Sequence, residues 1–293
     1  MNFGTLEAGG TKMVLSIGNE QNEIIERIAI PTEEPAKTIP AMIAWFKERN
    51  IVALGIGTFG PVDLNPQSPT YGWITKTPKL AWRDTPILSM LKDGLGIPCC
   101  IDTDVNAAAL AEYKLGAAKG TGSCVYVTVG TGIGGGLVVE GHLVHGMMHP
   151  EVGHMLLRPM ANDPAPDGFC PYHKACVEGL ASGPAIEKRW GKKAIELPKD
   201  HPAWELETDY LAQMCVSLIC TVSPEKIILG GGVMQQKHLF EGIRKKTVDL
   251  LNGYIPTAEI LEHMDEYIVE PGLGTASGAL GALLLSYAAY EGK

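Results

Sequence analysis

Long apolar segments, an excess of positive charge and a disulfide pattern are all missing from this 293-residue sequence. No run of about 18 apolar residues occurs, so the sequence predicts no membrane-spanning helix. Residues 1–11 lack the basic start and apolar stretch of an export signal, which favours a cytoplasmic protein. The formal net charge of −9 argues against nucleic-acid binding, because an acidic surface repels phosphate backbones. Seven scattered cysteines, an odd number, fit a reducing compartment and a metal site better than a set of disulfides.

Apolar residues and glycine are abundant instead. Apolar residues make up 45% of the chain and charged residues 19%, a composition that supplies a packed core and excludes a disordered protein. The 35 glycines are about 12% of the chain, against a usual share of about 7%. They follow no collagen period and cluster beside apolar runs, as phosphate-binding turns require. Because the protein is acidic, we expect backbone N–H groups and a metal, more than a basic patch, to hold any phosphate.

Strands and helices alternate along the chain, which predicts an α/β protein. A strand–glycine turn–strand unit occurs near residue 10 and again near residue 132, which suggests two related domains. Residues 60–97 read as one long loop, and a loop of that length in a compact domain is usually functional or disordered. The expected strands are 3–7, 12–17, 23–30, 51–57, 98–101, 123–129, 137–139, 226–229 and 268–269, and the expected helices are 35–50, 106–115, 209–222, one from 239, and 275–290.

Two glycine turns between strands are candidates for phosphate binding. The first is Glu-Ala-Gly-Gly-Thr-Lys at 7–12, where glycine lets backbone amides approach an anion, although a simple hairpin turn explains it too. The second, 130–136, contains Gly-x-Gly-x-x-Gly, but a strand follows it where a dinucleotide fold needs a helix. No Gly-Lys-Ser/Thr closes it as a Walker loop. Two such turns in different halves fit a nucleotide clamped between two domains, with the glycines of 230–232 as a third candidate beside the adenosine.

Two thiols and two imidazoles lie within 23 positions: His154, Cys170, His173 and Cys176. Closed tetrahedral zinc sites take such sets, and a loop rich in Pro, Gly and Asp gains its order from a metal. With all four positions filled by protein, the zinc is expected to be structural. The alternative is two free cysteines and two surface histidines.

Together these motifs resemble those of the ROK family of sugar kinases (repressor, open reading frame, kinase). The resemblance covers nearly the whole chain and rests on 7–12, Asp102-Thr-Asp-Val-Asn-Ala, 130–136, Glu151-Val-Gly-His, and the cysteine loop that ends in Cys-Val-Glu-Gly at 176–179. Within the family the chain is similar to the bacterial fructokinase branch, by Glu7, the segment 60–66, Thr-Pro-Lys at 77–79 and His-Pro-Ala-Trp at 201–204. One departure is that the family's cysteine loop supplies three thiols, whereas His173 stands here among two.

The resemblance implies an actin-like ATPase (ribonuclease H-like) fold, with two α/β domains around a cleft. Residues 1–105 with 275–293 are expected to form a smaller N-terminal domain, and 106–274 a larger one with the zinc-binding loop. The resemblance also implies a homodimer, with ATP, Mg²⁺ and Zn²⁺ as cofactors, a small-molecule sugar as partner, and neither nucleic acid nor membrane.

Site residues follow from the same resemblance. Asp104 is implied as the general base that receives the proton of a sugar hydroxyl, with capping of the following helix as its alternative role. Asp102 is less suited as base and is expected to help hold magnesium or the loop. Contacts with the sugar are implied at Gly60, Pro61, Thr103, Glu151, His154 and Glu178, and contacts with ATP at Gly9, Gly10, Thr11, Lys12, Thr131, Gly132, Gly134, Pro184, Gly231 and Gly232.

Two of these assignments leave questions open. His154 is asked to bind both zinc and sugar, which its two ring nitrogens allow. Without the family, Glu151 and Glu178 read as solvated loop charges. The sequence therefore predicts an ATP-dependent kinase that converts D-fructose to D-fructose 6-phosphate. Its alternatives are a kinase of the same family for mannose, glucose or an amino sugar, and a non-catalytic sugar-sensing regulator, whose DNA-binding segment has no room ahead of Glu7.

Overall fold

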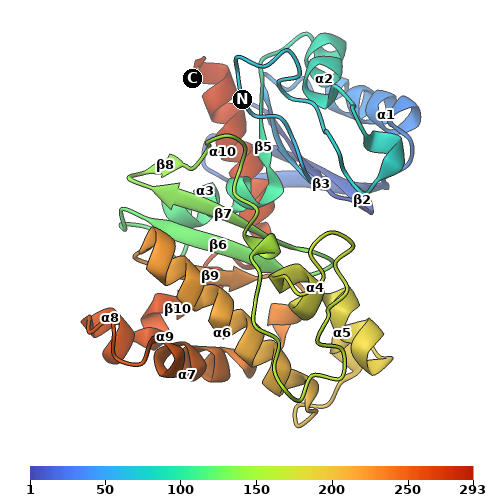
Figure 1. Cartoon of the computed structure of the whole chain (residues 1–293). Helices are drawn as coiled ribbons and strands as arrows, with labels where there is room; N and C mark the ends of the chain where they lie inside the picture. The colour runs from blue at the N-terminus through green and yellow to red at the C-terminus, as the bar shows by residue number, and fades with distance from the viewer. Residues whose placement is uncertain (293) are drawn as a thin grey trace. The chain divides into compact units, whose positions relative to one another are not determined.

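A computed structural model describes residues 1–292 and divides into two compact units, each built on a five-stranded sheet (Figure 1). The first unit comprises Met1–Gly116, Leu143–Pro150 and Thr275–Lys293, and the second comprises Ala117–His142 and Glu151–Gly274. The sequence analysis assigned 106–116 and 143–150 to the second domain, whereas contacts place both segments in the first unit. The α/β class and the actin-like ATPase fold are confirmed.

The sheet of the first unit has the order β3-β2-β1-β4-β5. Strands β1 to β3 form an antiparallel meander, and β4 and β5 extend it in parallel from β1. The glycine turn 9–11 joins β1 to β2. The strands are β1 Phe3–Ala8, β2 Lys12–Gly18, β3 Ile24–Pro31, β4 Leu54–Thr58 and β5 Cys99–Thr103.

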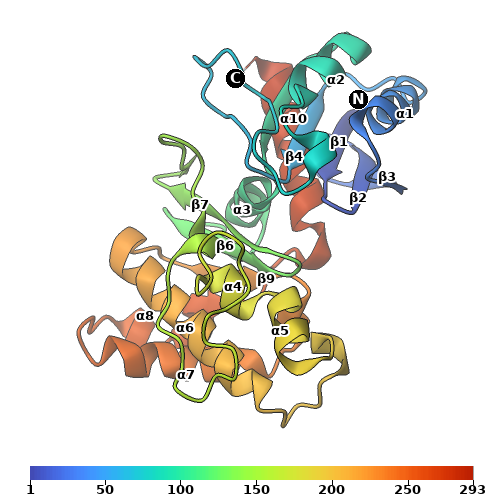
Figure 2. The ribbon, with the colours of Figure 1, turned by 45° about the vertical axis from the view of Figure 1, so that its right-hand side comes forward.

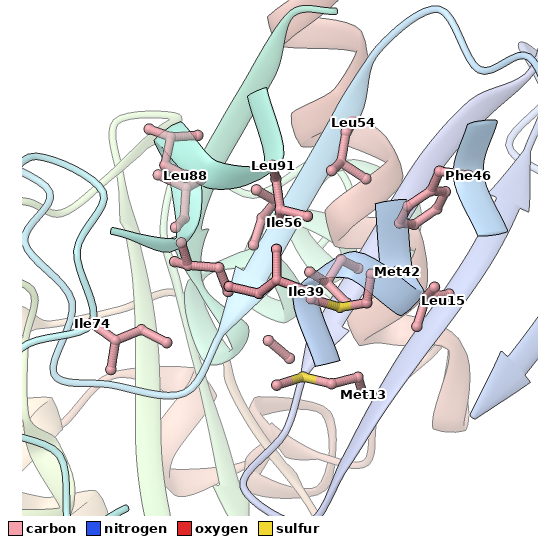
Figure 3. Close-up of a cluster of buried hydrophobic side chains, with 14 of the residues drawn as sticks. Met13, Leu15, Ile39, Met42, Phe46, Leu54, Ile56, Ile74, Leu88 and Leu91 are labelled. Carbon is pink, nitrogen blue, oxygen red and sulfur yellow. The ribbon is translucent and has the colours of Figure 1, made fainter. Parts of the chain in front are cut away.

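Helices α1 (Pro35–Lys47) and α2 (Ile87–Leu95) cover one face of this sheet. Proline at the first turn of α1 suits the helix start, where its missing N–H costs nothing. Figure 3 shows the core they form: side chains of α1 and α2 point toward those of β1, β2 and β4. Helix α2 was not expected, because it is only nine residues long and the prolines and polar residues around it obscure its helical periodicity.

The other face is covered by α3 (Asp104–Leu115) and α10 (Ser277–Glu291), which pack on each other. Gly55 of β4 explains part of the glycine excess. A Cβ there would lie 1.8 Å from the carbonyl oxygen of Ala282, so only glycine lets α10 approach the sheet this closely. Glycine in this chain therefore serves helix–sheet contact as well as turns.

The sheet of the second unit has the order β10-β9-β6-β7-β8. Its hairpin β6–β7 and its parallel partner β9 repeat the arrangement of β1–β2 and β4, which agrees with the predicted internal repeat. One expectation was wrong: β7 begins at Ile133 instead of residue 137, because Gly134 to Gly136 pair with β6 as strand residues. The strands are β6 Cys124–Val129, β7 Ile133–Val139, β8 His142–Leu143, β9 Ile227–Gly230 and β10 Ile268–Val269.

The helices of the second unit include α6, which starts at Ala203, six positions before the predicted 209, and which packs against α7 (Figure 2). Four short helices were not expected, because each is too brief to show a helical period. The helices are α4 Val177–Ala181, α5 Gly183–Trp190, α6 Ala203–Val222, α7 Leu239–Leu251, α8 Ala258–Leu261 and α9 Met264–Tyr267. Among residues 1–292, no helix is long and apolar enough to cross a membrane.

Candidate functional site

The first glycine turn is closed by one hydrogen bond and leaves two amides free. The N–H of Gly9 donates to the carbonyl oxygen of Lys12 at 3.1 Å. The amides of Gly10 and Thr11 donate to no atom of the described chain, and Thr11 and Lys12 are exposed. The turn is thus both a hairpin connection and a set of unpaired donors, which is what an anion site built from backbone requires.

Three predicted ATP-binding segments of the second unit lie together around Gly130. The turn is closed by the N–H of Gly130 on the oxygen of Gly132 at 2.9 Å, and the amides of Thr131 and Gly132 have no partner in residues 1–292. The N–H of Gly183, next to Pro184 at the start of α5, donates to the oxygen of Gly130 at 2.8 Å. The nitrogen of Gly232 lies 3.8 Å from the Cβ position of Gly130, and Gly231 adopts a left-handed φ of +93°.

Gly134 does not belong with these free amides. It is a residue of β7 and pairs with Thr128 of β6. The structure therefore narrows the second turn from the predicted 130–136 to Gly130–Gly132. Gly135, also inside β7, packs so closely that a Cβ would lie 2.4 Å from Val152.

The turn between β5 and α3 presents Asp104. Thr103 is the N-cap of α3, since its hydroxyl oxygen accepts from the N–H of Asn106 at 3.0 Å. Asp104 is the first residue of the helix and accepts from the N–H of Val105 at 2.9 Å. The capping role that rivalled catalysis thus falls to Thr103. Solvent reaches the Asp104 residue, although protein atoms surround its carboxyl closely enough to shift its pKa.

The surroundings of Asp104 suit a base. Burial among protein atoms raises the pKa of its carboxyl to about 6, partly offset by backbone amides and reinforced by the nearby Glu7 carboxylate. Solvent still reaches the residue, as a substrate hydroxyl must. A pKa near the working pH combines an ionised carboxylate with a useful proton affinity.

Because of this pKa, we expect catalytic activity to fall as the pH is lowered below about 6. Protonated Asp104 accepts no proton, so kcat/KM should decline about tenfold for each pH unit below about 6 and be flat from 7 to 8. Initial rates from pH 4.5 to 8, with stability checked at each pH, measure this. An acid limb centred near pH 4, the ordinary range of an aspartate, would contradict the shift.

Asp102 is buried, and both of its carboxylate oxygens form hydrogen bonds with protein groups. Its Oδ1 accepts from the N–H of Thr103 and from Nδ2 of Asn106, each at 2.7 Å. Its Oδ2 lies 2.8 Å from Nε2 of His145, and this hydrogen bond raises the pKa of His145. Asp102 therefore holds the loop, the second of the two roles considered for it.

A second histidine, His149, contacts the turn at Gly60-Pro61, which is another predicted sugar-binding segment of the first unit. Gly60-Pro61 is a cis peptide, and the N–H of Val62 donates to Nε2 of His149 at 3.3 Å. Sequence analysis missed both His145 and His149, since neither belongs to a motif with known chemistry. The available signal in the sequence was that both histidines lie shortly before the motif Glu151-Val-Gly-His.

The four predicted metal ligands converge in the second unit. Their ligand atoms all lie within 4.8 Å of one another. Nδ1 of His154 is 3.6 Å from Sγ of Cys176 and 3.9 Å from Sγ of Cys170, which is 3.8 Å from Nδ1 of His173. Ligands about 2.0 to 2.3 Å from a tetrahedral zinc are about 3.3 to 3.8 Å apart, so the set fits this ion.

Backbone amides donate to both thiol sulfurs. The N–H of His173 donates to Sγ of Cys170 at 3.5 Å, and the N–H of Gly179 donates to Sγ of Cys176 at 3.4 Å. Burial raises the pKa of the Cys176 thiol to about 11, and the amide of Gly179 offsets part of that rise. Gly179 is required here, because a Cβ would lie 1.8 Å from the oxygen of Lys174.

The predicted sugar-binding residues of the second unit adjoin this cluster. His154 directs Nδ1 at the thiols, which leaves Nε2 for another partner. The N–H of His154 donates to the oxygen of Glu151 at 2.9 Å. Oε2 of Glu178 accepts from the N–H of Ile133 at 3.0 Å, so this carboxylate is tied to the second glycine turn and is not a free loop charge.

The model of the ROK family matches this chain over residues 3–289. The chain is 46% identical to a fructokinase of Pediococcus pentosaceus over 291 residues, which are 99% of both chains. It is 41% identical to a fructokinase of Zymomonas mobilis, covering 98% of this chain and 97% of that one. A solved ROK hexokinase from Thermus thermophilus has a TM-score of 0.80 at 28% identity and covers 100% of both chains.

Proposed function

Because the chain belongs to the ROK family, we propose that it is an ATP-dependent kinase that converts D-fructose to D-fructose 6-phosphate. Full-length relatives named fructokinase, at 38% to 49% identity, support the reaction and the sugar. The observation that carries the mechanism is Asp104: an accessible carboxylate with a raised pKa, at a helix start that another residue caps.

Phosphoryl transfer to a sugar hydroxyl depends mainly on positioning and charge stabilisation, with a carboxylate to take the proton. In this proposal Asp104 orients the 6-hydroxyl and accepts its proton as the oxygen attacks the γ-phosphorus of ATP. In the first unit the free amides of Gly10 and Thr11 are donors for phosphate oxygens, and in the second unit those of Thr131 and Gly132 are donors of the same kind. Mg²⁺ bound with ATP would supply positive charge to the phosphates.

Sugar hydroxyls are assigned to carboxylate and imidazole acceptors. Glu151, His154 and Glu178 contribute from the second unit, and Gly60, Pro61 and Thr103 from the first. A Zn²⁺ ion held by His154, Cys170, His173 and Cys176 would fix the loop that carries the three acceptors. We propose further that the enzyme is a cytoplasmic homodimer.

A coupled assay of ADP release over a panel of free sugars tests the proposal. Fructose is expected to give the highest kcat/KM, with glucose, mannose and N-acetylmannosamine lower by about tenfold or more, since misplaced hydroxyls leave buried acceptors unpaired. A preference for one of the other sugars would refute the substrate and leave the kinase class in place. No ADP release with any of them would refute the catalytic function and favour a sugar-sensing regulator.

A further inference from the structure

Lys79 lies beside the first glycine turn, although the site described above makes no use of it. Its Cε is 3.6 Å from the position that a Cβ at Gly10 would take. The ammonium is one bond further along, so it is within about 5 Å of the same point. The methylene stem of Lys79 therefore reaches the turn at Gly10 within van der Waals distance.

Hydrogen bonds on both sides of Lys79 fix the loop that carries it. The N–H of Lys79 donates to the hydroxyl of the buried Thr77 at 3.3 Å, and Nε of Arg83 donates to the carbonyl of Thr77 at 2.8 Å. On the other side, the fully buried Trp82 donates from Nε1 to the oxygen of Glu33 at 2.7 Å. The loop is thus held at residues 77 and 82.

The glycine turn is tied to the same stretch of chain that receives Trp82. The N–H of Thr32 donates to the oxygen of Thr11 at 3.1 Å, and the hydroxyl of Thr32 donates to the oxygen of Gly9 at 2.7 Å. Residues 32 and 33 therefore link the turn to the loop of Lys79. This network fixes the backbone of the Lys79 loop relative to the turn, and the side chain of Lys79 spans the remaining distance to Gly10.

The charge of Lys79 has no partner. Among residues 1–292 its ammonium forms no ion pair, in a protein whose net charge is −9. Lys37 lines the same pocket of about 500 Å³ as Lys79, yet its ammonium is 3.8 Å from the carboxylate of Glu33. The unpaired ammonium lies next to two unpaired amides, and these donors together suit a bound anion.

We infer that Lys79 binds the phosphate chain of the nucleotide at the first glycine turn. Its ammonium pairs with a phosphate oxygen, while the amides of Gly10 and Thr11 donate to neighbouring oxygens. Lysine suits this task as a compact charge with three donors on a flexible stem. The inference rests on the proposed function, because it requires ATP to bind at this turn.

Substitution of Lys79 by methionine tests the inference, since methionine keeps an unbranched apolar stem and removes the charge. Calorimetric titration with Mg²⁺-ATP and with Mg²⁺-ADP should show Kd raised about tenfold or more, as loss of one charge-assisted hydrogen bond implies. Lys79→Arg should recover part of the affinity. The matched control, Lys37→Met, removes an ion-paired lysine from the same pocket and should change Kd less than about twofold.

The outcomes separate this inference from the proposed function. A Lys79→Met protein with unchanged thermal stability and wild-type nucleotide affinity overturns the role of Lys79, even where fructose is phosphorylated. Weakened nucleotide binding in Lys79→Met supports it, even where the wild type phosphorylates none of the sugars tested. Should Lys79→Met not fold, Lys79→Gln provides the same comparison with a polar stem.

Discussion

Replacing Asp104 with asparagine is expected to lower kcat by about 10² to 10⁴-fold, the usual contribution of a general base. Asparagine keeps the size of the side chain and its hydrogen bond from Val105, but it cannot take a proton. Because Thr103 caps α3, the free energy of unfolding should change by less than about 1 kcal/mol. Steady-state kinetics with ATP and fructose, together with a thermal melt, measure both effects, and the KM for fructose should stay within a few-fold.

Asp102→Asn is the matched control, two residues away. Asp102 holds Asn106 and His145 in a buried position, so its loss of charge should act on stability, by about 1 to 3 kcal/mol, more than on the chemical step. A folded Asp102→Asn enzyme without turnover, next to an active Asp104→Asn enzyme, would reverse the two roles.

Removal of the thiol of Cys176, a proposed zinc ligand, is expected to have the second large effect. The wild-type protein should contain about one zinc per chain, and Cys176→Ser should lose most of it, because one ligand of the closed site is gone. The loop that carries His154 and Glu178 then loses its order. We expect the KM for fructose to rise about tenfold or more and the melting temperature to fall, as measured by metal analysis, kinetics and calorimetry.

Cys220→Ser controls for the loss of a thiol as such, because Cys220 is exposed and lies outside the cluster. Its zinc content, KM and melting temperature should match those of the wild type. Wild-type protein that binds no zinc, or Cys176→Ser protein with full zinc and unchanged KM, would argue against a structural metal.

Much of the fold could be predicted because its signals are local in the sequence. Alternation of apolar strands with helices predicted the α/β class, and two strand–glycine–strand units suggested two related domains, which agrees with the two similar sheets. The metal cluster was equally accessible, since four ligands within 23 positions need only one loop to bring them together. Such features depend on spacing along the chain and on little else.

What escaped prediction depends on contacts between distant segments. His145 is a lone histidine until the fold sets it against Asp102, 43 positions earlier. Gly55 lies in a predicted strand, and its need for glycine shows only where α10 packs on it. Lys79 is a surface charge in the sequence, and only the buried Trp82 and its bond to Glu33 show that the loop is fixed beside the glycine turn.

A crystal structure with fructose and a non-hydrolysable ATP analogue would test the central claim most directly. The account predicts that a carboxylate oxygen of Asp104 lies about 2.6 to 3.2 Å from the 6-hydroxyl of fructose, with the phosphate chain at the amides of Gly10 and Thr11. A sugar bound out of reach of Asp104, or a nucleotide bound away from that turn, would contradict it.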